Sequence, residues 1–388
     1  MAVTTCKARL FGRGLLLALV LAGTQVSASD PDQEAKARLG QQLFFDPILS
    51  QDRTQSCATC HVPDQGFMDA RDNGVAGSAS LGDDGHSLGN RNTPSAGYAA
   101  LTPEFHLKAN GEYAGGLFWD GRANSLAEQA MGPPLNPVEM ALPDAATAAE
   151  RLLEKEHYRQ QFAQLYGEAV SEDPQALYEA MADAIAAFEE TDFFAPFDSR
   201  YDRYLRGEVE FTQQEELGRT LFFSQQFTNC NSCHQLHTSP RAERETFSNY
   251  EFHNIGVPAN QQLNAARNSD AVDTGLFQHP QIDDPEHKGK FKTPSLRNVA
   301  VTGPYMHNGV FQDLRTVVLF YNQYNSRSPA RQINPETGEN WAAPEVPQNL
   351  SLDLLESGPA LDDRRIDALV AFLKTLTDQR YEQLLPES

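Results

Sequence analysis

Apolar residues recur at helical spacing along much of this 388-residue chain, whereas the alternation typical of strands is weak. The clearest helical stretches are 145–166, 174–194 and 362–376. The last stretch places five apolar residues on one face: Ile366, Leu369, Val370, Phe372 and Leu373. Long polar or glycine-rich loops are expected at 74–92, 259–290 and 326–360. We therefore expect a mainly α protein.

One apolar pattern occurs twice along the chain. The segment LGQQLFF covers 39–45, and LGRTLFF covers 217–223. Each predicts an amphipathic helix that is followed by a short loop. The repeat indicates a duplicated domain, so we expect one domain over 29–200 and a second over 201–388.

The first 28 residues have the features of a secretory signal peptide. Basic residues come first (Lys7, Arg9 and Arg13), then an apolar run over 15–22, then small residues over 26–28. This order predicts export and cleavage near Ala28. The apolar run is too short to span a bilayer, and no later stretch is long and apolar enough to do so. We expect an exported protein without a membrane anchor.

The cysteines form the most informative motif. Of five cysteines, Cys6 lies in the leader, and the other four belong to two C-x-x-C-H words at 57–61 and 230–234. This word is the attachment signature of c-type haem. We therefore expect two covalent haem c groups, attached through Cys57, Cys60, Cys230 and Cys233, with His61 and His234 as iron ligands. Export of such a protein indicates a bacterial periplasm.

Two other kinds of site also use Cys-x-x-Cys. A zinc ion shared by both words would need four thiolates and gives no reason for a histidine after each second cysteine. A dithiol redox site needs one pair in a βαβ setting. Haem c accounts for all four cysteines and both histidines.

The chain carries 53 acidic and 31 basic residues, a formal net charge of −22. Phosphate backbones would be repelled, so nucleic acid is not an expected partner. The charge suits a basic redox partner, although it could equally serve solubility alone.

Seven short motifs carry a family resemblance. They are 43–47, 56–61, 91–95, 118–122, 129–133, 136–140 and 293–298. Together they resemble the bacterial di-haem cytochrome c peroxidase and MauG family, over nearly all of the chain after the leader. The resemblance implies two cytochrome c-like haem domains in tandem and a haem-dependent oxidoreductase that uses hydrogen peroxide.

The resemblance also implies different work for the two haems. The first would bind peroxide, with His61 as proximal ligand and Glu139 as distal acid and base. Gln129 and Pro133 would line the same pocket. The alternative for Glu139 is an ordinary solvated carboxylate.

The chain has two tryptophans. By resemblance Trp119 lies between the two haems, where an indole could share an electron hole; it could also be a core residue only. Trp341 lies in no such motif, and we interpret it as loop packing.

The sixth ligand of the second haem distinguishes the branches of the family. Where the peroxidases have Met, this chain has Tyr321. A phenolate stabilises ferric and higher iron, whereas a thioether favours ferrous iron. At the position of Tyr321 the chain therefore resembles the MauG branch. In that branch both haems share a bis-ferryl state, and a tryptophan of a partner protein is oxidised. Met306 as the ligand, or an aromatic cluster with Tyr305 and Tyr324, are the alternatives.

Three further expectations follow from the resemblance. Asn92, Thr302 and Pro304 match a calcium site between the haems, and hard oxygen donors suit calcium. His86 could cap the first haem, although an exposed loop histidine fits its spacing better. Thr228 stands where the MauG enzyme has a relay tryptophan, so either another residue relays the electron hole or the partner differs, and the partner is left open.

Three functions remain. The first is peroxide-driven oxidation of a periplasmic protein, and the alternative is a cytochrome c peroxidase that draws electrons from a small cytochrome or cupredoxin. The third is a non-catalytic electron carrier. Glu139 separates the enzymes from the carrier, and Tyr321 separates the two enzymes.

Overall fold

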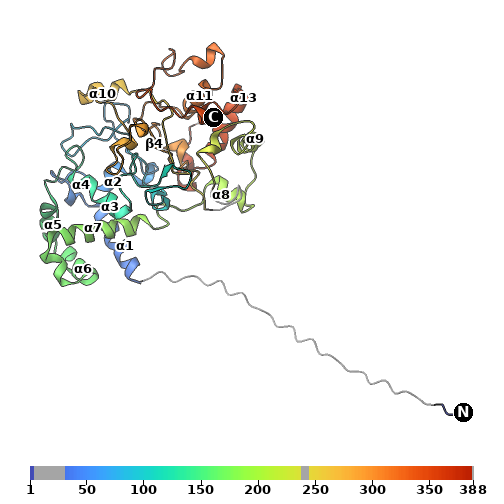
Figure 1. Cartoon of the computed structure of the whole chain (residues 1–388). Coiled ribbons are helices and arrows are strands. Elements are labelled where there is room, and N and C mark those ends of the chain that lie inside the picture. Colours follow the sequence, from blue (N-terminus) through green and yellow to red (C-terminus); the bar gives the residue numbers. More distant parts are fainter. Residues whose placement is uncertain (4–30, 237–243, 387–388) are drawn as a thin grey trace.

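The computed structural model describes residues 1–3, 31–236 and 244–386, so the expected signal peptide lies almost wholly outside the described residues (Figure 1). The longer helices are α1 (Pro31–Phe45), α5 (Ala145–Leu153), α6 (Glu156–Tyr166), α7 (Pro174–Glu189), α9 (Gln213–Phe222), α11 (Leu314–Gln323) and α13 (Asp363–Lys374). The shorter ones are α2 (Cys57–Cys60), α3 (Leu126–Ala130), α4 (Gly132–Leu135), α8 (Arg200–Leu205), α10 (Gln261–Arg267) and α12 (Leu352–Leu355).

Sheet is confined, in the described part of the chain, to two antiparallel pairs of two-residue strands. They are β1 (His106–Leu107) with β2 (Tyr113–Ala114), and β3 (Phe252–His253) with β4 (Phe291–Lys292). The protein is mainly helical, as predicted. Over the same described residues, none of the helices combines the length and the apolar character needed to cross a membrane.

Three predicted segments differ in detail. The helix expected over 145–166 is two helices, because the chain turns at Lys155 so that both Leu152 and Tyr158 enter the core. The helix expected over 174–194 ends at Glu189, after which Phe194 folds back onto the core. The expected loop 259–290 contains α10, whose single buried residue is too few to produce a periodic pattern.

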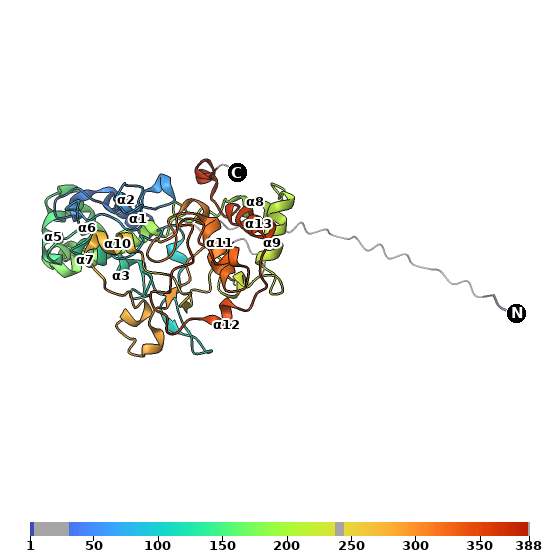
Figure 2. The same ribbon diagram turned by 90° about the horizontal axis from the view of Figure 1, so that it is seen from above.

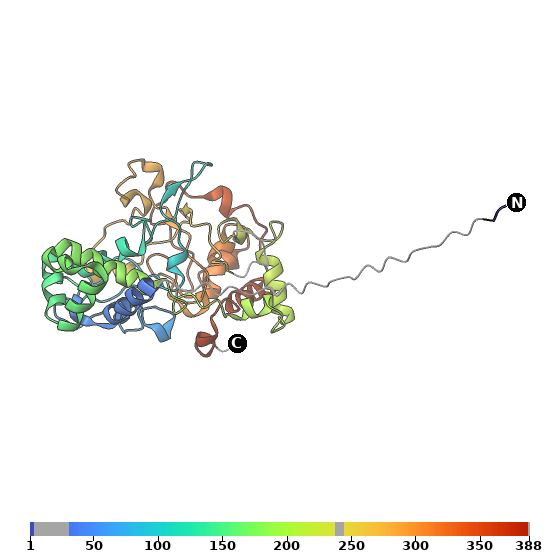
Figure 3. The same ribbon diagram turned by 90° about the horizontal axis from the view of Figure 1, so that it is seen from below.

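The described chain has two large hydrophobic cores, and each is built on a pair of crossed helices. In the first, α1 crosses α7; in the second, α9 crosses α13. Figures 1 and 2 show α1, α5, α6 and α7 on one side of the molecule and α8, α9, α11 and α13 on the other, and the view from below in Figure 3 shows the same division. The chain passes from the first core at Phe194 to the second at Tyr201.

The repeated glycine explains the two crossings. A Cβ on Gly40 would lie 1.8 Å from the carbonyl oxygen of Ala184 on α7, and a Cβ on Gly218 would lie 1.9 Å from that of Ala368 on α13. Only glycine therefore permits each helix pair to approach so closely. The repeated sequence produces a repeated contact.

A second repeated feature joins the two halves. The turns at 117–123 and 305–311 are each closed by an antiparallel bridge. Phe118 and Met306 take the same left-handed position in these turns, with φ of 62° and 73°. The backbone contacts are also reciprocal, since Asn92 N–H donates to the His307 carbonyl at 2.7 Å and Lys292 N–H donates to the Trp119 carbonyl at 3.0 Å. The backbone of each half therefore forms a hydrogen bond with the turn of the other half.

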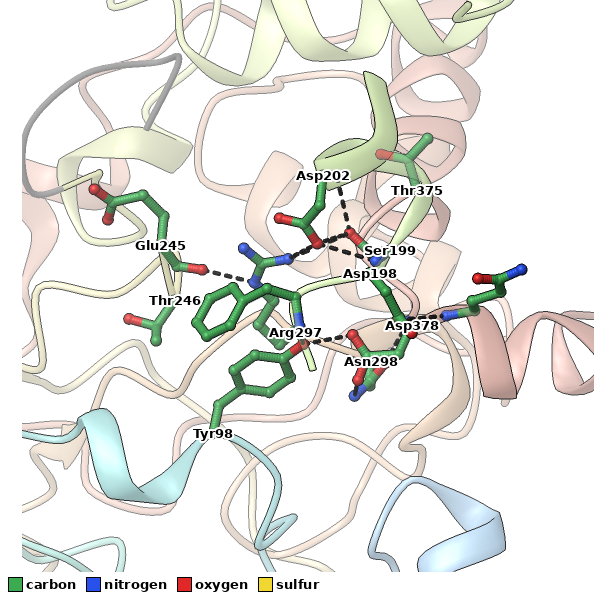
Figure 4. Close-up of polar contacts among 12 residues, drawn as sticks. Tyr98, Asp198, Ser199, Asp202, Glu245, Thr246, Arg297, Asn298, Thr375 and Asp378 are labelled. Carbon is green, nitrogen blue, oxygen red and sulfur yellow. Dashed lines mark hydrogen bonds and ion pairs between the residues drawn. The ribbon is translucent and has the colours of Figure 1, made fainter. Parts of the chain in front are cut away.

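A buried polar network also connects the two halves of the protein (Figure 4). Arg297 donates to Asp202 Oδ2 at 2.6 Å and to Ser199 Oγ at 3.2 Å. Tyr98 of the first half hydrogen-bonds to Asp378 near the C-terminus, and Asn298 Nδ2 donates to the same carboxyl at 2.8 Å. These charges are buried but paired, so separating them would leave uncompensated groups.

Candidate functional site

The second C-x-x-C-H word opens onto a large cavity between α9, α11 and α13. Cys230, Cys233 and His234 line one part of its wall, and Tyr321 of α11 lines another. The cavity holds about 1720 Å³ of empty space, part of it open to solvent.

His234 is held as a neutral imidazole with one nitrogen engaged. Its Nδ1 contacts the Phe247 carbonyl at 3.0 Å, and burial lowers its pKa to about 4. A neutral ring whose Nδ1 is fixed by a carbonyl leaves Nε2 as a metal ligand. Burial raises the pKa of the Tyr321 phenol, and the nearby Cys233 and Cys230 raise it further, so a phenolate there requires a bound cation.

Two buried histidines on the same wall have free nitrogens. The Nε2 atoms of His253 and His307 have no hydrogen-bond partner within the described structure. The nearest carboxylates, Glu251 and Glu345, are 3.7 Å and 3.9 Å away. An unpaired buried polar atom is costly, so these nitrogens indicate an acceptor inside the cavity.

The first C-x-x-C-H word adjoins a second cavity, of about 1220 Å³ including space open to solvent. His61 and Gln129 are among its lining residues. The His61 Nδ1 contacts the Phe67 carbonyl at 3.3 Å, and burial lowers its pKa, which is the arrangement of His234 repeated. Cys57 packs against the first core and Cys230 against the second, so the two words occupy separate sites.

Glu139 lies beside the first word without being part of the cavity wall, and the same holds for Pro133. Asn136 Nδ2 donates to Glu139 Oε1 at 2.8 Å. Burial raises the pKa of Glu139, while Arg122 and the Asn136 hydrogen bond oppose this shift. The Glu139 charge in turn contributes to the raised pKa of Cys60, which is about 11. A carboxyl with a raised pKa next to the word is suited to proton transfer.

Trp119 forms part of the wall of both cavities. Its indole N–H donates to the Asn92 carbonyl at 2.8 Å. The next residue, Asp120, pairs with Arg91 at 2.7 Å, and Arg91 also pairs with Asp273 at 2.6 Å. Although burial alone would raise the pKa of Asp273, the Arg91 guanidinium holds it below its usual range. These pairs fix the backbone that carries the indole.

The three residues expected to bind calcium, Asn92, Thr302 and Pro304, all line the second cavity. His86 is exposed on a turn, where its N–H donates to Asp84 at 2.8 Å. Thr228 is 4% exposed, and its hydroxyl donates to the Leu221 carbonyl at 2.7 Å.

Met306 sits in the turn at 305–311, as expected, and it lines both cavities.

Sequence reasoning missed several residues of these walls: Glu189, His253, Lys292, Arg297 and His307. Glu189 lines the second cavity, and burial raises its pKa to about 8. Lys292 lines both cavities and donates to the Gly116 carbonyl; burial lowers its pKa to about 7, against the opposing charge of Asp120. The one feature of the sequence that could have pointed to Lys292 is its position directly before the 293–298 motif.

The two walls fit haem c. Each presents a neutral histidine that directly follows a pair of half-buried cysteines, with apolar side chains around it; Cys230 and Cys233 also line their cavity. Haem also carries two propionates, and the free Nε2 atoms of His253 and His307 and the unpartnered Nη2 of Arg297 are donors that suit such anions. Burial raises the pKa of the Cys57 and Cys233 thiols to about 12, and the two words pack against separate cores, so their four sulfur atoms do not converge on one zinc ion.

Comparison with known proteins agrees with this geometry. A family model described as di-haem cytochrome c peroxidase matches residues 34–210. The chain is 56% identical over 376 residues to the methylamine utilization protein MauG of Paracoccus denitrificans, and the alignment covers 96% of each protein. The chain belongs to the di-haem cytochrome c peroxidase and MauG family. It is therefore a haem-dependent oxidoreductase of a family that carries two haem c groups.

Other members of the di-haem family are also similar. The cytochrome c peroxidase Ccp of Escherichia coli is 34% identical over 280 residues, which cover 72% of this chain and 51% of that protein. Among solved structures, the diheme peroxidase BthA of Burkholderia thailandensis has a TM-score of 0.80 at 36% identity, and the match covers 92% of this chain and 89% of BthA.

Proposed function

We propose that this protein is a periplasmic di-haem enzyme of the MauG type, which uses hydrogen peroxide to oxidise a tryptophan of a partner protein. The observation that carries the proposal is Tyr321, a half-buried phenol on the wall of the same cavity as His234. The 56% identity to a MauG protein supports the same branch. The two cores correspond in this proposal to two haem domains in tandem, over 29–200 and 201–388.

Haem c bound in each cavity would supply an iron for O–O cleavage and for storage of oxidising equivalents. His61 and His234 would bind the irons, and the four cysteines would attach the porphyrins covalently. At the first site, the Glu139 carboxyl would take the proton from one peroxide oxygen and return it to the other. Asn136 orients that carboxyl, and Gln129 and Pro133 would confine the peroxide.

At the second site, Tyr321 would bind as a phenolate, whose negative charge favours the oxidised metal. The half-buried Trp119, shared by both cavity walls, would let the two sites exchange an electron. The two-electron oxidation of the partner would supply two electrons and release two protons, which balance the reduction of one hydrogen peroxide to two water molecules.

The remaining parts of the proposal rest on chemistry and on the family. Asn92 through its side-chain oxygen, with the Thr302 and Pro304 carbonyls, would bind one calcium ion that stiffens the segment between the sites. The leader over 1–28 would direct the chain to the periplasm. The acidic surface suits a basic partner protein.

The deciding experiment adds hydrogen peroxide to the fully oxidised protein and records its absorption spectrum by stopped flow. We expect a two-electron-oxidised state without prior reduction. The Tyr321→His variant should keep both haems and lose that state, because a neutral imidazole offsets the added positive charge less well. A wild-type protein that reacts only after one-electron reduction would overturn the proposal.

The second candidate is a cytochrome c peroxidase that reduces peroxide with electrons from a small cytochrome or cupredoxin. The relative of that name in Escherichia coli, at 34% identity, favours it. Rapid turnover with a reduced small cytochrome, together with a need for prior reduction, would establish this function instead.

A further inference from the structure

Beyond the two cavities, an aromatic path leads from the second one toward the surface. Tyr321 lines the cavity, and the ring of its neighbour Phe320 lies 6.0 Å away between centroids. Phe320 is 1% exposed, and its ring lies 5.6 Å from the indole of Trp341, which is partly exposed. Phe311 contacts the same indole at 5.7 Å. The indole therefore joins the surface to the cavity wall through one buried ring.

The loop that carries Trp341 is firmly attached to α11. The Trp341 N–H donates to the Gln332 carbonyl at 3.0 Å, and the Gln332 side chain donates to the Gln323 and Ser326 carbonyls at 3.2 Å and 2.8 Å. The indole N–H donates to the Arg331 carbonyl at 2.9 Å. These contacts hold the ring at a fixed separation from Tyr321, which electron transfer between them requires.

We propose that Trp341 is the surface relay through which an electron of the partner protein enters the second cavity; this rests on the proposed function. The chain has two tryptophans, and Trp119 lies at the wall between the cavities, which leaves Trp341 for a surface role. Thr228 beside the second word is buried and is not an oxidisable side chain.

The steps balance one electron at a time. The peroxide-oxidised centre takes one electron from Trp341, which becomes a radical cation. Trp341 then regains an electron from the partner's tryptophan, and a second cycle uses the second oxidising equivalent of the peroxide. Unlike a phenol, an indole can give up an electron without first transferring its proton, and its N–H is hydrogen-bonded to the Arg331 carbonyl.

Tyr324 is the competing residue on the same path, since its ring lies 6.1 Å from Phe320. Oxidation of a phenol releases its proton, and the Tyr324 hydroxyl donates to the Ile255 carbonyl at 2.9 Å, which cannot accept one. The geometry therefore favours the indole, and Tyr324→Phe is a matched control for Trp341→Phe.

The test treats three oxidised holoproteins with hydrogen peroxide in the absence of any partner: wild type, Trp341→Phe and Tyr324→Phe. Samples labelled with ring-deuterated tryptophan are frozen for electron paramagnetic resonance, and digested samples are examined by mass spectrometry. We expect a tryptophan radical signal in wild type and Tyr324→Phe, and in Trp341→Phe we expect the loss of the Trp341 component, so that only a signal from Trp119 can remain. We also expect oxygen atoms added to the peptide that contains Trp341 in the first two proteins.

Optical spectra separate the two ways in which the test can fail. If all three proteins form the peroxide-oxidised state but give the same radical signal, with no oxygen on the Trp341 peptide, the relay is wrong and the proposed function stands. If wild type forms no oxidised state, the proposed function is wrong and the relay with it.

Discussion

At the scale of single residues, Glu139 is the group whose replacement tests peroxide activation directly. Burial raises its pKa, which suits a carboxyl that takes up and returns a proton. We expect Glu139→Gln to retain both haems and to form the oxidised state more slowly, by on the order of 10²-fold or more. The wild-type rate should also fall as the pH drops through the raised pKa, because the basic form is lost, and the variant should lack this dependence.

Stopped-flow absorbance measures both effects. Glu150→Gln, an exposed carboxylate on α5, is the control and should behave as wild type. An unchanged rate in Glu139→Gln would reduce Glu139 to a structural carboxylate.

Glu189 provides a second residue-scale prediction, on stability. Burial raises its pKa from 4.5 to about 8, so the folded state favours the protonated acid. Its contribution to stability is fully present below pH 4.5 and is lost as the pH rises through about 8. Glu189→Gln removes this titration and should therefore stabilise the protein relative to wild type at pH 8, by a few kcal/mol.

Thermal unfolding at several pH values measures the difference. Glu179→Gln, on the exposed face of the same helix, should leave the wild-type pH dependence in place. If wild type and Glu189→Gln lose stability in parallel between pH 5 and 8, the carboxyl is already ionised in the folded state.

At the scale of helices, the fold depends on two crossings that only glycine permits. A methyl group at Gly218 would overlap the Ala368 carbonyl, and one at Gly40 would overlap the Ala184 carbonyl. We expect Gly218→Ala to lower the free energy of unfolding by roughly 1–3 kcal/mol or more, although alanine is the better helix former. Urea unfolding measures this, and Thr220→Ala, on the exposed face of α9, is the matched control. A neutral Gly218→Ala would mean that the helices can move apart freely.

At the scale of the whole molecule, both cavities are shaped for groups that the chain must attach covalently. All four cysteines after the leader belong to the two C-x-x-C-H words. We therefore expect two haems per chain that stay with the denatured protein in acid acetone. A pyridine haemochrome spectrum measures the number of haems per chain. In the Cys233→Ser variant, one haem should be attached by one thioether bond in place of two. Extraction of the pigment into acetone would contradict the covalent assignment.

The sequence alone determined what depends on neighbours along the chain. Helical periodicity predicted the mainly α fold, and the repeated LGxxLFF segment predicted two related helices, because both signals span only a few turns. The C-x-x-C-H words for the same reason identified His61, His234, Cys230 and Cys233, which line the cavities. Family motifs added Glu139, Trp119 and Tyr321, whose roles remain predictions.

Only the tertiary structure decided which distant residues meet. Lys292 and Trp119 share the wall between two cavities, although 173 positions separate them, and no local pattern signals that contact. The burial of His253 and His307, and the lack of a hydrogen-bond partner for their Nε2 atoms, can be recognised only in the folded structure. From the sequence we interpreted Trp341 as a packing residue of a loop. The proposed relay function depends on the attachment of that loop to α11, the helix that carries Tyr321. Burial and contact across long separations are properties of the folded chain, and they carry most of the chemistry here.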